Sequence, residues 1–173
     1  MKSLAIIIPA YKDTYLRETL DSLVSQTVNK FLVYIGDDCS PYNLQSIISE
    51  YEDKLNIVYV RFDNNLGGQS LVAQWNRCVA MSKEKYIWLF SDDDLLPPDA
   101  VERFWNFEES HKEIFDICRL PLELVDKNGN TTMKLEDYPR YMCSEDYLIK
   151  RLSCEILSSA SEYIFTREIY NKY

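Results

Sequence analysis

Three consecutive aspartates, Asp92, Asp93 and Asp94, follow the large apolar residues 86–90 after a single serine. Adjacent carboxylates repel one another, and they keep their charge when a cation joins them. A hard divalent cation such as Mg²⁺ or Mn²⁺ prefers oxygen ligands and commonly completes its shell with phosphate oxygens. Two simpler roles are the alternatives: solvation of Asp94, and capping of the helix after Pro98 by one of the aspartates. Three adjacent charged groups are more than these two roles require. The triplet therefore predicts a site for a cation that in turn binds a diphosphate.

Asp37 and Asp38 form a second acidic pair, and they follow another apolar run at residues 31–35. Alone the pair is a weak indication, because aspartates also start turns and cap helices. If both apolar runs are strands of one sheet, the two acidic groups can converge at its edge. The chemistry therefore depends on the elements that carry these groups.

Strand and helix patterns alternate over the first part of the chain. Continuous apolar runs, typical of buried parallel strands, occur at residues 4–8, 31–35, 57–62 and 86–90. Helices are predicted over residues 13–26, from residue 43, and over residues 69–82 and 100–107. This alternation predicts an α/β fold, with a mostly parallel, Rossmann-like sheet flanked by helices on both faces. Ligands bind at the carboxyl ends of such strands. The polar residues at those ends are Tyr11, Asp13, Asp37, Asp38, residues 63–65 and the aspartate triplet.

The same patterns assign individual side chains. Asp13 is predicted to cap the first helix, and Pro9 is expected to stop the first strand. In the third helix, Val72, Trp75 and Val79 are predicted to face the core.

The pattern changes after about residue 112. Residues 116–135 predict two strands joined by a turn at Asn128 and Gly129. Residues 144–153 predict a short amphipathic helix, and residues 162–173 a strand leading into a helix. We expect a single domain over residues 1–173, with a nucleotide-binding first part (1–110) and a smaller, antiparallel-leaning second part (111–173).

Composition narrows the classes of function. The 173 residues are 46% hydrophobic, which is enough for a core. The net charge of -9 argues against nucleic acid as a partner, because phosphate backbones need a basic face. The five cysteines form no C-x-x-C pair and predict reduced thiols in a cytosolic protein, with no zinc site. No signal peptide opens the chain, and no apolar run reaches the roughly 18 residues of a membrane span.

Two other classes of protein place acidic residues at strand ends. A receiver-like phosphoacceptor domain needs a lysine at the end of a later strand, and residues 119–126 contain none. A haloacid-dehalogenase-like phosphatase needs D-x-D after the first strand, where this chain has only Asp13. A Walker A loop and a G-x-G-x-x-G loop are also absent.

Six short segments occur along the chain in this order: IIIPAYKD, SQT, IGDDCS, NNLGG, WN and YIWLFSDDDLLPP. This series resembles the family 2 glycosyltransferases of GT-A fold. They commonly show P-x-Y-N, V-D-D-G-S, N-x-G, R-N and a D-x-D-D-x-x-x-P stretch. The later segments SEDYLIKRL and YIFTREIY resemble the family's E-D motif and the segment after it, which extends the resemblance over nearly the whole chain.

The resemblance implies inverting transfer of a sugar from a nucleoside diphosphate sugar, with a UDP-sugar expected, to a glycan or lipid-linked acceptor. The residues implied to bind the donor nucleotide are Pro9, Tyr11, Asp13, Asp38, Gly67, Asn76 and Asp92. Among these, Asp38 is expected to hydrogen-bond the base. Asp93 and Asp94 are implied to hold Mn²⁺ or Mg²⁺, and which of the three adjacent aspartates binds the metal stays open.

Asp146, with Glu145 beside it, is implied to be the general base that takes the proton from the acceptor hydroxyl. The alternative for this pair is stabilisation of a helix N-terminus by negative charge. Asp146→Asn is therefore predicted to retain UDP binding and to lose transfer.

The chain departs from the family pattern at several positions. Phe90 stands where the first acidic residue of the D-x-D-D stretch is common, and Cys39 replaces the glycine of D-D-G-S. Lys12 replaces the asparagine of P-x-Y-N, and Trp75 the arginine of R-N. The absence of Q-x-x-R-W argues against a processive synthase. The chain ends where many members continue, so a C-terminal part is expected to be missing.

A catalytically inactive nucleotide-sugar-binding domain is the alternative function, because it would share every donor-site residue. The family also implies a role in surface polysaccharide synthesis in the cytoplasm, at the inner face of the membrane, by peripheral association.

Overall fold

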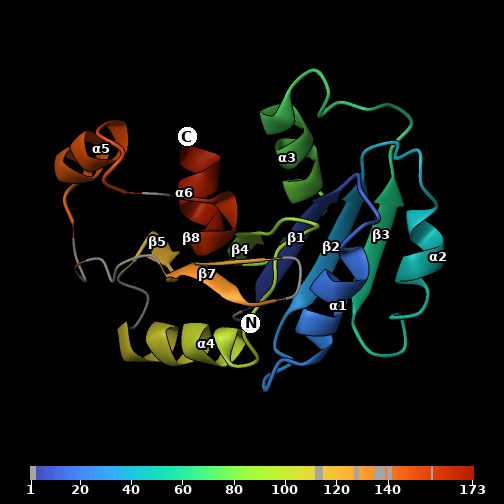
Figure 1. Ribbon diagram of the computed structural model, residues 1–173, viewed down its shortest axis with the longest axis horizontal. Coiled ribbons are helices and arrows are strands. Elements are labelled where there is room, and N and C mark those ends of the chain that lie inside the picture. The colour runs from blue at the N-terminus through green and yellow to red at the C-terminus, as the bar shows by residue number, and fades with distance from the viewer. Residues whose placement is uncertain (1–2, 112–114, 127–128, 135–138, 140–141, 157) are drawn as a thin grey trace.

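A computed structural model describes residues 3–111, 115–126, 129–134, 139, 142–156 and 158–173. A six-stranded sheet in the order β3-β2-β1-β4-β8-β5 runs through the molecule (Figure 1). Its strands are β1 (Leu4–Ala10), β2 (Leu32–Asp37), β3 (Ile57–Arg61), β4 (Tyr86–Leu89), β5 (Ile117–Arg119) and β8 (Tyr163–Thr166). The strands β1 to β4 are parallel, and β8 is antiparallel to both of its neighbours. The predicted α/β fold with a mostly parallel sheet is confirmed.

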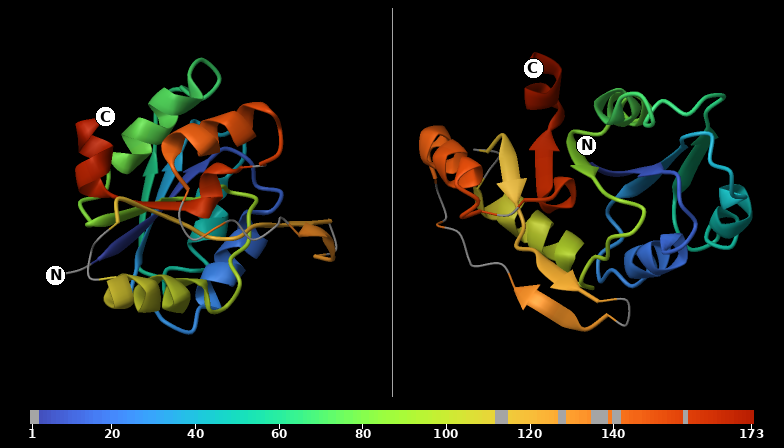
Figure 2. Two further views of the ribbon diagram at one scale, coloured as in Figure 1. Left: turned by 90° about the vertical axis from the view of Figure 1, so that its left-hand side faces the viewer. Right: turned by 45° about the horizontal axis from the view of Figure 1, so that its top comes forward.

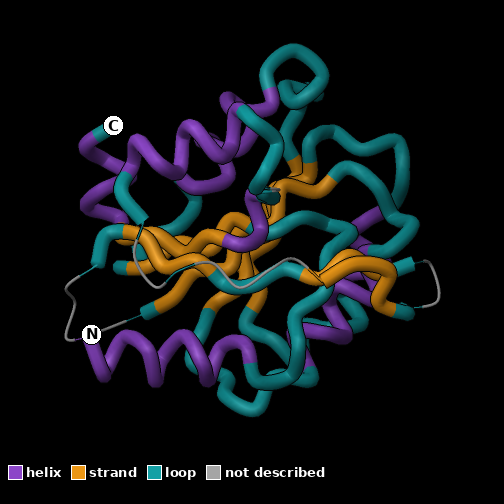
Figure 3. The backbone as a smooth tube through the Cα atoms, turned by 60° about the vertical axis from the view of Figure 1, so that its left-hand side comes forward, coloured by secondary structure: helices purple, strands orange, loops and turns teal. Residues whose placement is uncertain are grey.

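Helices cover both faces of this sheet, as the tube in Figure 3 shows. They are α1 (Leu16–Val24), α2 (Leu44–Ile48), α3 (Leu71–Val79), α4 (Ala100–His111), α5 (Ser144–Leu152) and α6 (Arg167–Lys172), together with the 3-10 turn η1 (Ala160–Glu162). The helices α1, α2 and α4 pack on one face, and α3 and α6 on the other. None of the described helices is both long and apolar enough to cross a bilayer.

Alternation along β1 creates the two cores. Leu4, Ile6 and Ile8 point into the larger cluster with α1, α2 and α4, whereas Ala5 and Ile7 point into the smaller cluster with α3. All five side chains are completely buried. A strand buried on both faces can be apolar at every position, which explains its continuous apolar sequence.

The second part of the chain completes the sheet of the first part. The strand β5 pairs with β8, whereas β6 (Glu123–Val125) and β7 (Thr131–Lys134) form a separate hairpin (Figure 2). The predicted strands joined by a turn correspond to β6 and β7, but the number of strands over residues 116–135 is corrected from two to three, because β5 is a separate strand that joins the main sheet. The predicted turn includes Gly129, which has the positive φ of 80° that glycine favours, while Asn128 lies outside the described residues.

Three local predictions are corrected. Tyr15, not Asp13, is the N-cap of α1, and no side chain caps it. Pro9 lies inside β1, one residue before its end and beyond Ile7, the last β1 residue that pairs with β4. Val72 is 60% exposed, and the buried residues of α3 are Gln74, Cys78 and Val79.

Candidate active site

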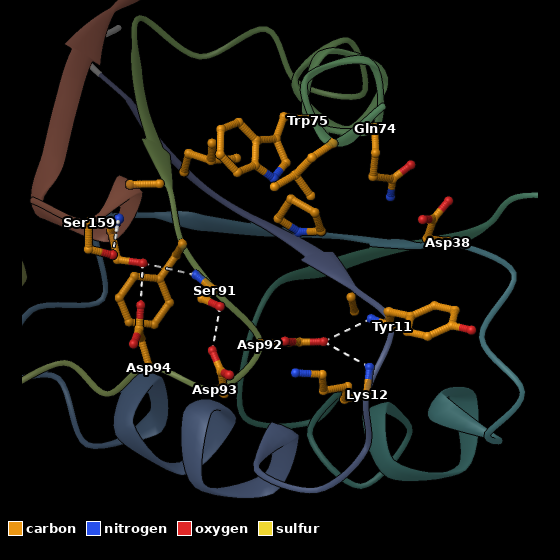
Figure 4. Close-up of a pocket in the computed structure, with 17 residues that line it drawn as sticks. Tyr11, Lys12, Asp38, Gln74, Trp75, Ser91, Asp92, Asp93, Asp94 and Ser159 are labelled. Atoms are coloured by element: carbon orange, nitrogen blue, oxygen red, sulfur yellow. Dashed lines mark hydrogen bonds between the residues drawn. The ribbon is translucent and has the colours of Figure 1, made fainter. Parts of the chain in front are cut away.

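A cavity of about 450 Å³ opens where β1, β2 and β4 end (Figure 4). The N-terminal half of α3 and the turn η1 form its other walls. The residues that line it are Pro9, Ala10, Tyr11, Lys12, Asp38, Leu71, Gln74, Trp75, Leu89, Phe90, Ser91, Asp92, Asp93, Asp94, Ser159, Ala160 and Ser161. The sheet thus brings the two predicted acidic groups together at its carboxyl edge, as expected for this topology.

The three adjacent aspartates each face a different partner (Figure 4). The buried Asp92 accepts hydrogen bonds through one oxygen from the amides of Tyr11, at 2.8 Å, and Lys12, at 3.0 Å. Asp93 is exposed and accepts from the hydroxyl of Ser91. Asp94 is half-buried and accepts from the hydroxyl of Ser161.

The three aspartates therefore do not form a preassembled metal site. Among the described residues, no three histidine, cysteine or acidic side chains are arranged to hold an ion together. Burial raises the pKa of the Asp92 carboxyl, against the lowering effect of its two amide donors. Burial likewise raises the pKa of Asp94, against the Ser161 hydrogen bond. Oxygen ligands from the exposed Asp93 and from Asp94 nevertheless suit Mg²⁺ or Mn²⁺, which commonly bind one or two carboxylates plus substrate phosphates.

Asp38 lines the cavity and also anchors the loop at residues 64–68. One carboxylate oxygen accepts from the amide of Leu66 at 2.7 Å and from the guanidinium of Arg77, and the other accepts from the amide of Gly67 at 2.8 Å. A carboxylate offers about four acceptor positions. Three are used here, which leaves one for the base that Asp38 is predicted to contact.

Arg77 does not line the cavity but pairs with Asp38, which does, and the sequence did not indicate this role. Its guanidinium pairs with Asp38, bonds the side chain of Asn64 at 3.1 Å and the carbonyl of Asn64 at 2.8 Å, and lies over the Phe62 ring. An indication in the sequence is that Arg77 lies two residues after Trp75, and Trp75 stands where the family commonly has arginine. A displaced arginine thus supplies a charge beside Asp38.

Asp37 has a structural role. Its carboxylate is completely buried and accepts from the amide of Ser40, the hydroxyl of Tyr59 and the guanidinium of Arg61, each at 2.7 Å. The next turn carries Cys39 at a φ of 54°, in the left-handed region that glycine adopts most easily. The glycine-like turn expected here thus forms with a cysteine in it.

The other predicted donor residues divide into two groups. Pro9, Tyr11, Asp38 and Asp92 line the cavity, as do the predicted metal ligands Asp93 and Asp94. Asp13, Gly67 and Asn76 are not among its lining residues. Gly67 acts through its amide on Asp38, and a Cβ there would come within 2.5 Å of that carboxylate. Asn76 instead accepts a hydrogen bond from Tyr170 of α6.

Glu145 and Asp146, the predicted base pair, are exposed in the first turn of α5 and do not line the cavity. Cys143 caps this helix through its sulfur. Tyr147 connects α5 to β8, because its hydroxyl lies 2.6 Å from that of Tyr163. The catalytic role of the pair remains a prediction.

The turn η1 supplies polar groups that no sequence motif indicated. Ser161 accepts from the amide of Ser91 and donates to Asp94, and the Trp88 ring donates to the Ser161 carbonyl at 2.7 Å. Trp75, predicted as core, packs against the smaller core cluster and also lines the cavity. The second part of the chain therefore forms one wall of the site.

Comparison with known proteins agrees with this geometry. Residues 5–168 match the sequence pattern of glycosyl transferase family 2. The chain belongs to this family. Over 124 residues it is 32% identical to the minor teichoic acid biosynthesis protein GgaB of Bacillus subtilis, a match that covers 68% of this family 2 chain and 13% of GgaB.

Solved structures support the fold. The crystal structure of Staphylococcus aureus TarS, residues 1–349, in complex with UDP-GlcNAc has a TM-score of 0.75 and 21% identity, and covers 99% of this chain and 47% of that one. TarS is a poly(ribitol-phosphate) β-N-acetylglucosaminyltransferase. The mannosyltransferase PcManGT of Pyrobaculum calidifontis, in complex with GDP-Man and Mn²⁺, has a TM-score of 0.68 and 14% identity over 99% of this chain and 47% of its own. This family 2 chain spans less than half the length of each of these relatives.

Proposed function

We propose that this domain transfers a sugar from a nucleoside diphosphate sugar to an acceptor hydroxyl, with inversion at the anomeric carbon. The observation that carries the proposal is the cavity at the carboxyl edge of the sheet, lined by Asp38, Asp92, Asp93 and Asp94, in a chain of this family. A UDP-sugar is the proposed donor, because TarS binds UDP-GlcNAc.

The proposed donor site runs from Asp38 to the aspartate triplet. Pro9 and Tyr11 would border the base, and Asp38 would accept a hydrogen bond from it with its remaining acceptor position. Asp92 fixes the loop after β1 through its two amide bonds, so that Tyr11 is held at the cavity wall. Asp92 would also contact the ribose or the sugar.

Asp93 and Asp94 are the proposed ligands of Mn²⁺ or Mg²⁺. When bound, the ion would stabilise negative charge on the departing diphosphate. PcManGT holds Mn²⁺ together with its nucleotide sugar, which supports a similar site here. Ser161 would orient Asp94 through its hydroxyl.

Asp146 is the proposed general base, with Glu145 beside it. A base takes the proton of the acceptor hydroxyl as that oxygen attacks, on the face of the sugar opposite the leaving group. The two roles therefore need carboxylates from different segments of the chain, and Asp146 on α5 and Asp93 after β4 would be those carboxylates. Asp13, Gly67 and Asn76 remain proposed donor-site residues, although they do not line the cavity.

Synthesis of a cell-surface polymer is the proposed process, because GgaB is a minor teichoic acid biosynthesis protein and TarS is a poly(ribitol-phosphate) glycosyltransferase. We propose a glycan or lipid-linked acceptor and peripheral association with the inner face of the membrane.

Calorimetric titration of UDP into the protein, with Mn²⁺ and then with EDTA, tests the donor site. Saturable UDP binding is expected, and it should tighten with Mn²⁺. UDP-GlcNAc and other UDP-sugars would then be screened for slow donor hydrolysis. If neither UDP nor GDP binds under either condition, the proposed function is wrong.

A catalytically inactive nucleotide-sugar-binding domain is the second candidate, because the predicted base pair does not line the cavity. The variant Asp146→Asn separates the two. An active enzyme should retain UDP affinity and lose on the order of a hundredfold or more in turnover, the contribution of a general base. The matched control is Glu155→Gln, an exposed carboxylate beyond the end of α5. UDP binding without transfer or hydrolysis in the unmodified protein would support the inactive domain.

A further inference from the structure

The cavity is strongly acidic, and a single basic side chain lines it. Its lining residues include four aspartates, and Lys12 is the one lysine or arginine among them. A nucleoside diphosphate brings further negative charge into this space. Positive charge must therefore come from a bound ion or from the protein itself.

The other cationic side chain near the cavity, that of Arg77, already has partners. Arg77 pairs with Asp38 and bonds the loop at Asn64, and its side chain is only 20% exposed. The Lys12 ammonium, by contrast, has no ion pair within 4.0 Å among the residues that the structure describes. It is an exposed charge at the rim of the cavity.

The base of the Lys12 side chain is held in place. Its amide donates to Asp92 at 3.0 Å, and the same oxygen accepts the amide of Tyr11. Figure 4 shows the Lys12 side chain extending beside that of Asp92. A fixed backbone with an exposed ammonium suits a phosphate, which lysine binds as a point charge.

Lys12 also stands where the family commonly has asparagine, so its charge is a property of this chain. At the same edge of the sheet, the three adjacent aspartates do not converge on one ion. A protein-borne cation would supply part of the charge that the metal alone would otherwise provide.

We propose that the Lys12 ammonium binds the diphosphate of the donor, so that this domain retains nucleoside diphosphate affinity in the absence of a divalent cation. This inference rests on the proposed function. It assigns a phosphate-binding residue outside the aspartate triplet.

Calorimetry with UDP and with uridine, in EDTA and in Mn²⁺, tests the proposal on the wild type and on Lys12→Met. In EDTA the variant should bind UDP on the order of tenfold more weakly, the scale of a charge-assisted hydrogen bond, and should bind uridine unchanged. The loss should be smaller in Mn²⁺, and Lys12→Arg should restore most of the UDP affinity. Lys83→Met is the matched control, because this exposed lysine precedes β4 at the opposite edge of the sheet and should leave both ligands unaffected.

Equal UDP affinities of the wild type and Lys12→Met in EDTA would overturn the inference and leave the proposed function intact. Equal losses for UDP and uridine would also overturn it, because they would indicate that Lys12 positions the loop and does not bind phosphate. UDP binding by the wild type only in the presence of Mn²⁺ would do the same. If the wild type binds neither UDP nor GDP, the proposed function itself is wrong and this inference falls with it.

Discussion

Two acidic residues that are adjacent in sequence have different roles in this domain. Each carboxylate accepts three hydrogen bonds, but Asp38 lines the cavity and Asp37 does not. Both are almost completely buried, at 0% and 4% exposed. A buried carboxylate is tolerated when hydrogen bonds and a counter-ion compensate for its lost hydration. The surrounding partners, and not the residue type, therefore set the role of each carboxylate.

Replacing Arg77 with methionine tests the importance of the counter-ion. The substitution leaves the Asp38 carboxylate buried without its ion pair, so we expect a loss of about 2–4 kcal/mol in the free energy of unfolding, measured by urea denaturation. The double variant Arg77→Met/Asp38→Asn should recover part of that loss. Arg103→Met is the control, because its pair with Asp99 is exposed and should contribute at most about 1 kcal/mol. Similar losses in Arg77→Met and Arg103→Met would contradict this account.

The sequence predicted that Asp38 and the triplet reach the cavity, but it also predicted Asp13, Glu145 and Asp146 for the site, and these do not line the cavity. It did not predict what each carboxylate contacts. Asp38 and the triplet follow apolar runs, and parallel strands bring their ends to one edge. The partners Arg77 and Ser161 lie 39 and 67 residues away from Asp38 and Asp94. No local periodicity carries such information, so these contacts depend on the packing of α3 and η1.

At the scale of elements, the distance between α3 and the sheet is set by a glycine. A Cβ on Gly36 would overlap the Cys78 sulfur and would lie 3.0 Å from the Phe62 ring. The Cys78 side chain is completely buried against β2. Since α3 also carries Gln74 and Trp75 into the cavity wall, this close contact fixes one side of the site.

Gly36→Ala should therefore destabilise the protein by about 1–3 kcal/mol, the usual cost of overpacking. Cys78→Ala in the same chain removes the overlapping sulfur, and the double variant should be more stable than Gly36→Ala alone. Urea midpoints of the wild type, both single variants and the double variant form the complete cycle. Additive effects of the two substitutions would show that the contact is not close.

Strand positions followed from the sequence better than strand partners. The four apolar runs of the first part correspond to β1 to β4. The sequence predicts β5 and β6 as a single strand, because only the three residues 120–122 separate them. Short apolar stretches also do not reveal which strand they pair with. The cap of α1 was also mispredicted, because Asp13 was available in sequence but the chain enters the helix at Tyr15.

At the scale of the whole molecule, the five free cysteines differ in how deeply they are buried. Cys78 and Cys118 are buried, Cys39 is half-buried, and Cys143 and Cys154 are exposed on either side of α5. Burial raises the pKa of Cys78 to about 12 and that of Cys118 to about 11. The thiolate is the reactive form, so both burial and pKa protect these two thiols.

At pH 8, a thiol reagent should label Cys143 and Cys154 rapidly, Cys39 more slowly, and Cys78 and Cys118 only as the domain unfolds. Labelling rates with and without urea, with mass spectrometry to assign the sites, provide the measurement. The variant Cys143→Ser/Cys154→Ser should lose the rapid phase and keep the others. Rapid labelling of Cys78 or Cys118 in buffer would contradict the described core.

The strand β8 comes from the end of the chain and yet lies inside the sheet, between β4 and β5. During synthesis, β4 must therefore wait as an edge strand, with Trp88 lacking its partner at Ser161, until residues 161–166 have left the ribosome. Unpaired apolar edges invite association with other chains. A nascent chain paused after α4 would thus be a target for chaperones, and its cavity would still lack the wall that η1 provides.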